Sequence, residues 1–62
     1  MFNVGDYIVL KASYDSRPMP VLLITEEDDS DYITPNGFVD KDDAHRWRIA
    51  TAEEVAVGHR LD

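Results

Sequence analysis

The sequence predicts a small, mainly β domain, with five short antiparallel strands in a partly open barrel or curled sheet and a short C-terminal helix at about residues 51–58. Runs of β-branched and aromatic residues recur along the chain, separated by turn residues. A helix-capping pattern stands near the C-terminal end. A length of 62 residues fits one domain, residues 1–62.

The first two predicted strands are residues 7–12 and 21–25. In the first strand Ile8, Leu10 and Ala12 share one face, which we assign to the core. The loop between the two strands contains two prolines, which favour extended or turn backbone. The second strand opens with four consecutive apolar residues, which predicts burial on both of its faces.

A tight hairpin is predicted in the middle of the chain. The tripeptide Pro-Asn-Gly at residues 35–37, flanked by β-formers, is the strongest local signal in the sequence. It joins a third strand at residues 31–34 to a fourth at residues 38–40. An acidic loop at residues 26–30 precedes this hairpin, and a polar connection at residues 41–44 follows it.

A fifth strand is predicted at residues 45–49, where side chains alternate. Trp47 and Ile49 share the face assigned to the core, with Trp47 as its main residue. Ile33 and Phe38 are assigned to the same core. Arg46 and Arg48 lie on the opposite face and are expected to pair with acids across the sheet.

The C-terminal helix has start and stop signals. Thr51 and Glu54 fit the capping box, with Thr51 as the N-cap and Glu54 three residues later. The helix is therefore expected at residues 52–57, with Gly58 just past its end. Val55 is expected to point inward.

The net charge of −7 is confined to residues 21–43, because residues 1–20 and residues 44–62 each sum to zero. The central segment holds a single lysine, Lys41, against eight carboxylates. These predicted partner-binding residues are Glu26, Glu27, Asp28, Asp29, Asp31, Asp40, Asp42 and Asp43. Such a polarised charge repels nucleic acid and attracts basic surfaces.

Three interpretations of the acidic segment are open at this point. It could be a solvated loop that keeps apolar strands apart, or a face that binds a basic protein, or a site for a hard cation such as calcium. The spacing does not match an EF-hand, which needs glycine at the sixth and glutamate at the twelfth loop position. We therefore expect no metal and no cofactor.

Enzymatic chemistry is not expected. The sequence has no G-x-S-x-G nucleophile motif and no glycine-rich phosphate loop, and a domain of this size offers little depth for a pocket. The two histidines, His45 and His59, are far apart in the sequence. Arg46 and Arg48 around Trp47 could stack on bases, but the negative charge argues against direct contact with nucleic acid.

Composition also bears on location. There is no cysteine, and no apolar run approaches the roughly 20 residues of a membrane span. The first residues carry no signal-peptide pattern, so we expect a cytoplasmic protein from a complete small reading frame, without membrane contact.

Two short motifs resemble known proteins. The segment FNVGDYIVL at residues 2–10 resembles the first strand of SH3-like barrels, where a Gly-Asp turn precedes an apolar strand. The segment RWRIATAEEVAVGHRL at residues 46–61 resembles the C-terminal ends of small phage and prophage proteins. The resemblance implies a phage-encoded accessory protein with an SH3-like fold, acting in the cytoplasm of the host cell.

The function predicted from these observations is binding of a basic protein surface. Carboxylates spaced along strands could imitate DNA phosphates and so inhibit a host nucleic-acid-handling protein, such as a nuclease, a restriction or CRISPR component, or RNA polymerase. The alternative is a structural or assembly module that forms homo-oligomers or packs in a virion. It would use the outward side of residues 21–24 together with Met19.

Overall fold

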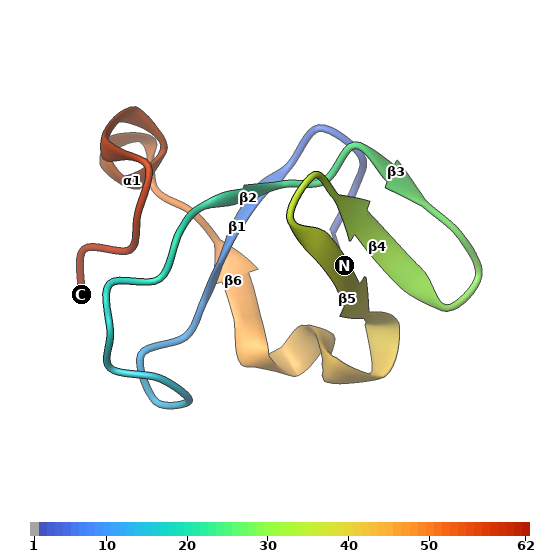
Figure 1. Ribbon diagram of the computed structural model, residues 1–62, viewed down its shortest axis with the longest axis horizontal. Coiled ribbons are helices and arrows are strands. Elements are labelled where there is room, and N and C mark those ends of the chain that lie inside the picture. The colour runs from blue at the N-terminus through green and yellow to red at the C-terminus, as the bar shows by residue number, and fades with distance from the viewer. Residues whose placement is uncertain (1) are drawn as a thin grey trace.

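The computed structural model describes residues 2–62 as two small antiparallel sheets and a short C-terminal helix, α1 (Figure 1). The first sheet has the strand order β2-β1-β6 and the second has the order β3-β4-β5. The bounds are β1 Tyr7–Leu10, β2 Leu22–Leu23, β3 Glu26–Glu27, β4 Asp31–Thr34, β5 Gly37–Asp40, β6 Trp47–Ile49 and α1 Ala52–Val57. The predicted mainly β chain with a C-terminal helix is confirmed, but the two sheets do not close into a barrel.

One bent segment connects the two sheets. It begins as β2 beside β1, and the Ile24 amide still donates to the Asp6 carbonyl on that side, at 3.0 Å. The next amide, Thr25, donates instead to the Ile33 carbonyl in the second sheet, at 2.9 Å. The segment then continues as β3, so the predicted acidic loop at residues 26–30 begins as a strand.

The core lies between the inner faces of the two sheets. Its fully or almost fully buried members are Ile8, Ile24, Tyr32 and Val39, with the partly buried Phe2, Leu22, Ala44 and Trp47 packed against them. Tyr32 also accepts a hydrogen bond from the Phe2 amide at 3.4 Å. Trp47 is only partly buried and packs against this cluster from its margin, so the prediction that it is the main core residue is wrong.

The alternation predicted for the first strand is wrong. Ile8 and Val9 are neighbours on β1 and both are fully buried, whereas Leu10 is only half-buried. The reason is that β1 is the central strand and is covered on both faces. The second sheet covers the Ile8 face, and the C-terminal segment lies over the Val9 face, where Arg48 is the cross-strand partner of Val9.

Three other side chains predicted to belong to the core are exposed. Phe38 is 73% exposed, Ile49 is 52% exposed and Val55 is 37% exposed. On the hairpin, Tyr32 and Val39 take the inner face, and their neighbours Ile33 and Phe38 therefore face outward.

The predicted hairpin is confirmed, with a turn of different geometry. Thr34 pairs with Gly37, which leaves Pro35 and Asn36 as the loop. Within residues 2–62 only glycines have positive φ, so Asn36 does not adopt the left-handed geometry of an Asn-Gly type I′ turn. The Thr34 hydroxyl closes the turn by donating to the Gly37 carbonyl at 2.8 Å and accepting from the Asn36 amide at 3.2 Å.

The predicted start and end of the C-terminal helix are confirmed. The Thr51 hydroxyl accepts from the Glu54 amide at 3.2 Å, and the Glu54 carboxylate accepts from the Thr51 amide at 2.9 Å. Gly58 ends the helix with a φ of 86°, in the left-handed region. The predicted polar connection and the start of the predicted fifth strand instead form a 3₁₀ helix, Lys41–Arg46, which links the two sheets at the bottom of the view in Figure 1.

Candidate functional site

The eight carboxylates predicted as the binding site all lie on the second sheet, in its β3–β4 turn, or in the 3₁₀ helix that follows it. We call these eight residues the acidic surface. The structure thus keeps these residues in neighbouring elements of the fold, although not as one loop. Their surroundings divide them into carboxylates that stabilise the fold and carboxylates that are available to a partner.

Glu26 and Glu27 point to opposite faces of β3. Glu26 lies opposite Ile33 and is exposed on the outer face of the sheet. Glu27 lies opposite Tyr32, and its carboxylate is 2.8 Å from the ammonium of Lys41. The same ammonium lies 5.2 Å from the centre of the Tyr32 ring, so the one lysine of the acidic segment is already occupied.

Asp28 holds the turn between β3 and β4. Its Oδ1 accepts hydrogen bonds from the amide of Ser30 at 2.9 Å and from the amide of Asp31 at 2.7 Å. These backbone hydrogen bonds lower the pKa of the Asp28 carboxyl below its usual value, and the one from Ser30 contributes most. A partner that bound this carboxylate would compete with the turn.

Asp31 and Asp40 form a like-charge pair across β4 and β5. The two residues are directly opposite in register. Like charges in this position destabilise a sheet. Asp40 offsets part of that by accepting from the Asp42 amide at 2.9 Å, which caps the 3₁₀ helix.

The remaining carboxylates lie at the surface. Asp43 is 3.8 Å from the Arg46 guanidinium, an exposed pair of little energetic weight. Asp29 and Asp42 are exposed and have no side-chain partner within residues 2–62. Glu26, Asp29 and Asp42 have neither a cationic partner nor a hydrogen bond to their carboxylates in the described part of the chain, and they are the most available members of the acidic surface.

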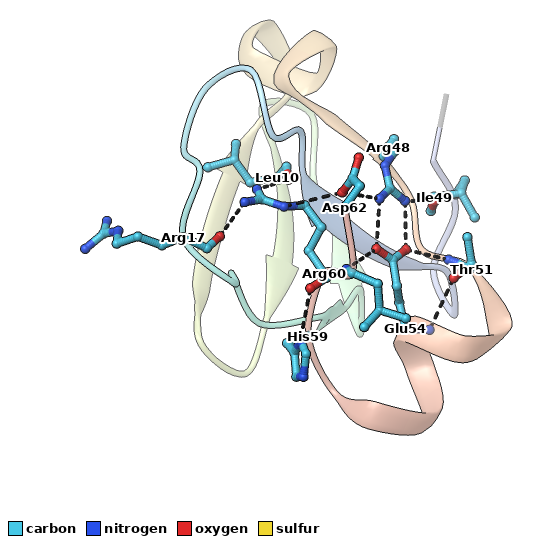
Figure 2. A network of polar contacts seen from close by, with 10 residues as sticks. Leu10, Arg17, Arg48, Ile49, Thr51, Glu54, His59, Arg60 and Asp62 are labelled. Atoms are coloured by element: carbon cyan, nitrogen blue, oxygen red, sulfur yellow. Dashed lines mark hydrogen bonds and ion pairs between the residues drawn. The ribbon is translucent and has the colours of Figure 1, made fainter.

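A second group of polar side chains lies at the opposite end of the molecule (Figure 2). It was not predicted from the sequence. Glu54 is 1% exposed, and both of its carboxylate oxygens accept from the Arg48 guanidinium at 2.8 Å. Glu54 Oε2 also accepts from the Leu61 amide at 2.9 Å, and Arg48 donates to Asp62 at 3.0 Å. Arg48 therefore pairs with the helix and the C-terminal segment, and the predicted pairing across the sheet is wrong for this residue.

Arg60 is the remaining member of this constellation and lies between Asp62 and the end of β1. It is 2% exposed, and its guanidinium donates to the carbonyl of Leu10 at 2.7 Å and to the carbonyl of Arg17. Its Nε has no hydrogen-bond partner and lies 3.5 Å from a carboxylate oxygen of Asp62. We call Arg48, Glu54, Arg60 and Asp62 the C-terminal ion network.

The charged groups of the C-terminal ion network pair with one another across three segments of the chain. The hydrogen bonds from Arg48 hold the pKa of Glu54 well below its usual value, and Glu54 in turn raises the pKa of Arg48. An open depression of about 460 Å³ lies beside the pair, between α1 and Leu61. Its only charged side chains besides the exposed Glu53 belong to this network.

The histidines do not meet. His45 packs edge-on against Tyr14, with ring centres 6.1 Å apart, and His59 Nδ1 lies 2.9 Å from the Arg60 carbonyl. Across residues 2–62, no three histidine or acidic side chains are arranged to hold a metal ion. No helix in this part of the chain is long and apolar enough to cross a membrane.

Comparison with known proteins gives no match to a family model, to a curated protein or to a solved structure.

Proposed function

We propose that this protein is a non-enzymatic accessory protein that binds a basic surface of a partner protein through its acidic surface. The confinement of the whole net charge of −7 to residues 21–43 carries the proposal. The geometry supports it, because those carboxylates share one sheet and its adjoining 3₁₀ helix, and six of the eight have no cationic partner in the described part of the chain. Opposite charge on a partner would also relieve the repulsion between Asp31 and Asp40.

The sharper form of the proposal is a phage-encoded inhibitor with an SH3-like fold, acting in the host cytoplasm on a nucleic-acid-handling protein. Duplex DNA presents a charge about every 1.7 Å along its axis. Carboxylates along and across strands are spaced by roughly 3.3 to 7 Å, so they can meet lysines and arginines that otherwise contact phosphates. The two motifs that resemble SH3-like barrels and phage proteins support the same assignment.

Charge reversal of Glu26, Asp29 and Asp42 to lysine is expected to abolish capture of the partner from a bacterial lysate. These three side chains carry no hydrogen bond or ion pair that stabilises the fold in residues 2–62, so the variant should keep its melting temperature within a few degrees. Capture is measured by pull-down and mass spectrometry. The wild-type protein should release the partner between about 0.05 and 0.5 M salt, because salt screens exposed charges.

A control variant, Glu53→Lys, changes an exposed acid on α1 outside the acidic surface and should capture the same partner as the wild type. For the inhibitor form, duplex DNA should compete with this protein for the captured partner. If the triple lysine variant retained the partner as well as the wild type does, the proposal would be contradicted. If DNA could not displace the partner, only the phosphate-mimic form would be contradicted, and acidic binding would stand.

The second candidate is a self-associating assembly module. The surface predicted for it is wrong in part, because Ile24 is fully buried and Leu22 packs against the core. Other apolar side chains on the first sheet and the C-terminal segment are exposed instead. They are Val4, Tyr7, Ile49, Val57 and Leu61.

Analytical ultracentrifugation at about 0.05 and 0.5 M salt separates the two candidates. The proposed function predicts a monomer at low salt, because copies with a net charge of −7 repel one another. Apolar association is little affected by the screening of charges. A dimer or larger oligomer present at both salt concentrations would therefore favour the assembly module.

A further inference from the structure

The outer face of the second sheet combines charge with an exposed aromatic side chain. Glu26, Ile33 and Phe38 form one cross-strand row through β3, β4 and β5. Side chains of adjacent rows alternate between faces, and the next row points into the core through Tyr32 and Val39. The row after that brings Asp31 and Asp40 back to the outside. We call Glu26, Asp31, Ile33, Phe38 and Asp40 the outer face.

Phe38 is the most exposed large apolar side chain among residues 2–62, at 73%. Ile33, its half-buried cross-strand partner, lies directly beside it, so the two form a small apolar centre and not an isolated contact. Acids lie on two sides of this centre. Glu26 is beside Ile33 on β3, and the Asp31–Asp40 pair is the next cross-strand row on the same face.

Neither solubility nor phosphate mimicry accounts for an exposed phenylalanine among these acids. A charged side chain at position 38 would suffice for solubility, and a phosphate mimic needs only charge. Aromatic side chains enclosed by a polar rim are instead typical of the anchors that carry affinity in protein interfaces.

We propose that the outer face docks a basic protein surface that has an apolar pocket, with Phe38 inserted in the pocket and lysines or arginines of the partner against Glu26, Asp31 and Asp40. The proposal rests on the proposed function and specifies the chemistry of its partner. Charge complementarity selects this occupant over a second copy of the chain, since two such faces would bring like charges together.

The experiment uses two fluorescently labelled peptides of equal positive charge. In one, lysines are spaced by serine and glycine, and in the other the central spacers are leucines. Fluorescence anisotropy at about 0.15 M salt measures both dissociation constants. The leucine peptide should bind about tenfold more tightly, and Phe38→Ala should remove that difference without changing the affinity for the serine-glycine peptide.

Matched variants control for fold and for nonspecific apolar contact. Val57→Ala removes a side chain that is 53% exposed on α1 and should leave both affinities unchanged. Phe38→Leu keeps an apolar anchor and should retain most of the difference. Since Phe38 is exposed, its variants should melt within a few degrees of the wild type.

The outcomes separate this inference from the proposed function. If both peptides bind equally and Phe38→Ala has no effect, the docking proposal is overturned while acidic binding stands. If neither peptide binds, the proposed function fails with it. A wild-type dimer at high salt that Phe38→Ala dissolves would make this face a self-association surface and would also overturn the proposal.

Discussion

Replacement of Glu54 by alanine is expected to lower the melting temperature by more than about 10 °C. Breaking a buried ion pair leaves the remaining charge uncompensated, and small domains lose several degrees for each unit of stability removed. Here the substitution leaves Arg48 with Asp62 as its remaining anionic partner, removes one half of the capping box, and leaves the Leu61 amide without its acceptor. Thermal unfolding followed by circular dichroism measures the effect.

The neighbouring substitution Glu53→Ala is the control. Glu53 is exposed on the same helix turn, so its removal should change the melting temperature by only a few degrees. A variant with alanine at position 54 that melted as the wild type does would show that the ion network contributes nothing to stability.

The same carboxylate predicts how stability depends on pH. Its pKa is lower in the folded protein than in the unfolded chain, where glutamate titrates near 4.3. Its contribution is therefore complete above about pH 4.3 and is lost as the pH falls toward the folded-state pKa. Between about pH 5 and pH 2 the melting temperature of the wild type should fall more steeply than that of Glu54→Gln, in which this group no longer titrates.

Arg60→Ala is expected to be as damaging as loss of Glu54. The buried guanidinium donates hydrogen bonds to the carbonyls of Leu10 and Arg17. Alanine would remove both hydrogen bonds and leave a cavity in place of the buried side chain. We expect a fall in melting temperature of more than about 10 °C. Arg60→Lys should recover only part of it, because a single ammonium does not reproduce the planar fork of donors.

Arg17→Ala provides the matched control, because Arg60 contacts only the backbone carbonyl of residue 17. The Arg17 side chain is 77% exposed and pairs with Asp15 at the surface. Its loss should leave the melting temperature nearly unchanged. Equal melting temperatures for the alanine variants at positions 17 and 60 would contradict a stabilising role for the buried guanidinium.

The features predicted correctly from the sequence are those that depend on neighbouring residues. The capping box of Thr51 and Glu54 and the stop at Gly58 depend on contacts within one or two helical turns. The hairpin depends on the tripeptide at residues 35–37 in the same way. Such contacts are set by local geometry whatever the rest of the chain does.

The features predicted wrongly depend on contacts between distant segments. Two neighbouring apolar residues, Tyr32 and Ile33, could each have pointed inward, and only the packing against the first sheet selects Tyr32. Val9 is buried because the distant C-terminal segment covers it, as its cross-strand pairing with Arg48 indicates. No local pattern distinguishes a buried Glu54 or Arg60 from the exposed charges expected of a small acidic protein.

The candidate site shows the same division. The charge sum places the acidic residues in one segment, and the structure has them on one sheet, in its turn and in its adjoining helix. Their separate roles follow from backbone contacts that the sequence does not display, such as the amides bound by Asp28. The same holds for Phe38, because its place in the alternation along β5 decides whether its side chain faces the core or the outside of the sheet.

The position of Arg60 also affects when the chain can fold during synthesis. The guanidinium binds the carbonyl of Leu10, a residue 50 positions earlier. Residues 58 and 60 hydrogen-bond with residues 21 and 19 in the same way. A nascent chain that has not reached residue 60 lacks these contacts, so one face of β1 stays uncovered until that residue has left the ribosome. Contacts of such long sequence separation also slow folding, so this small domain should fold after, and not during, the synthesis of its first 60 residues.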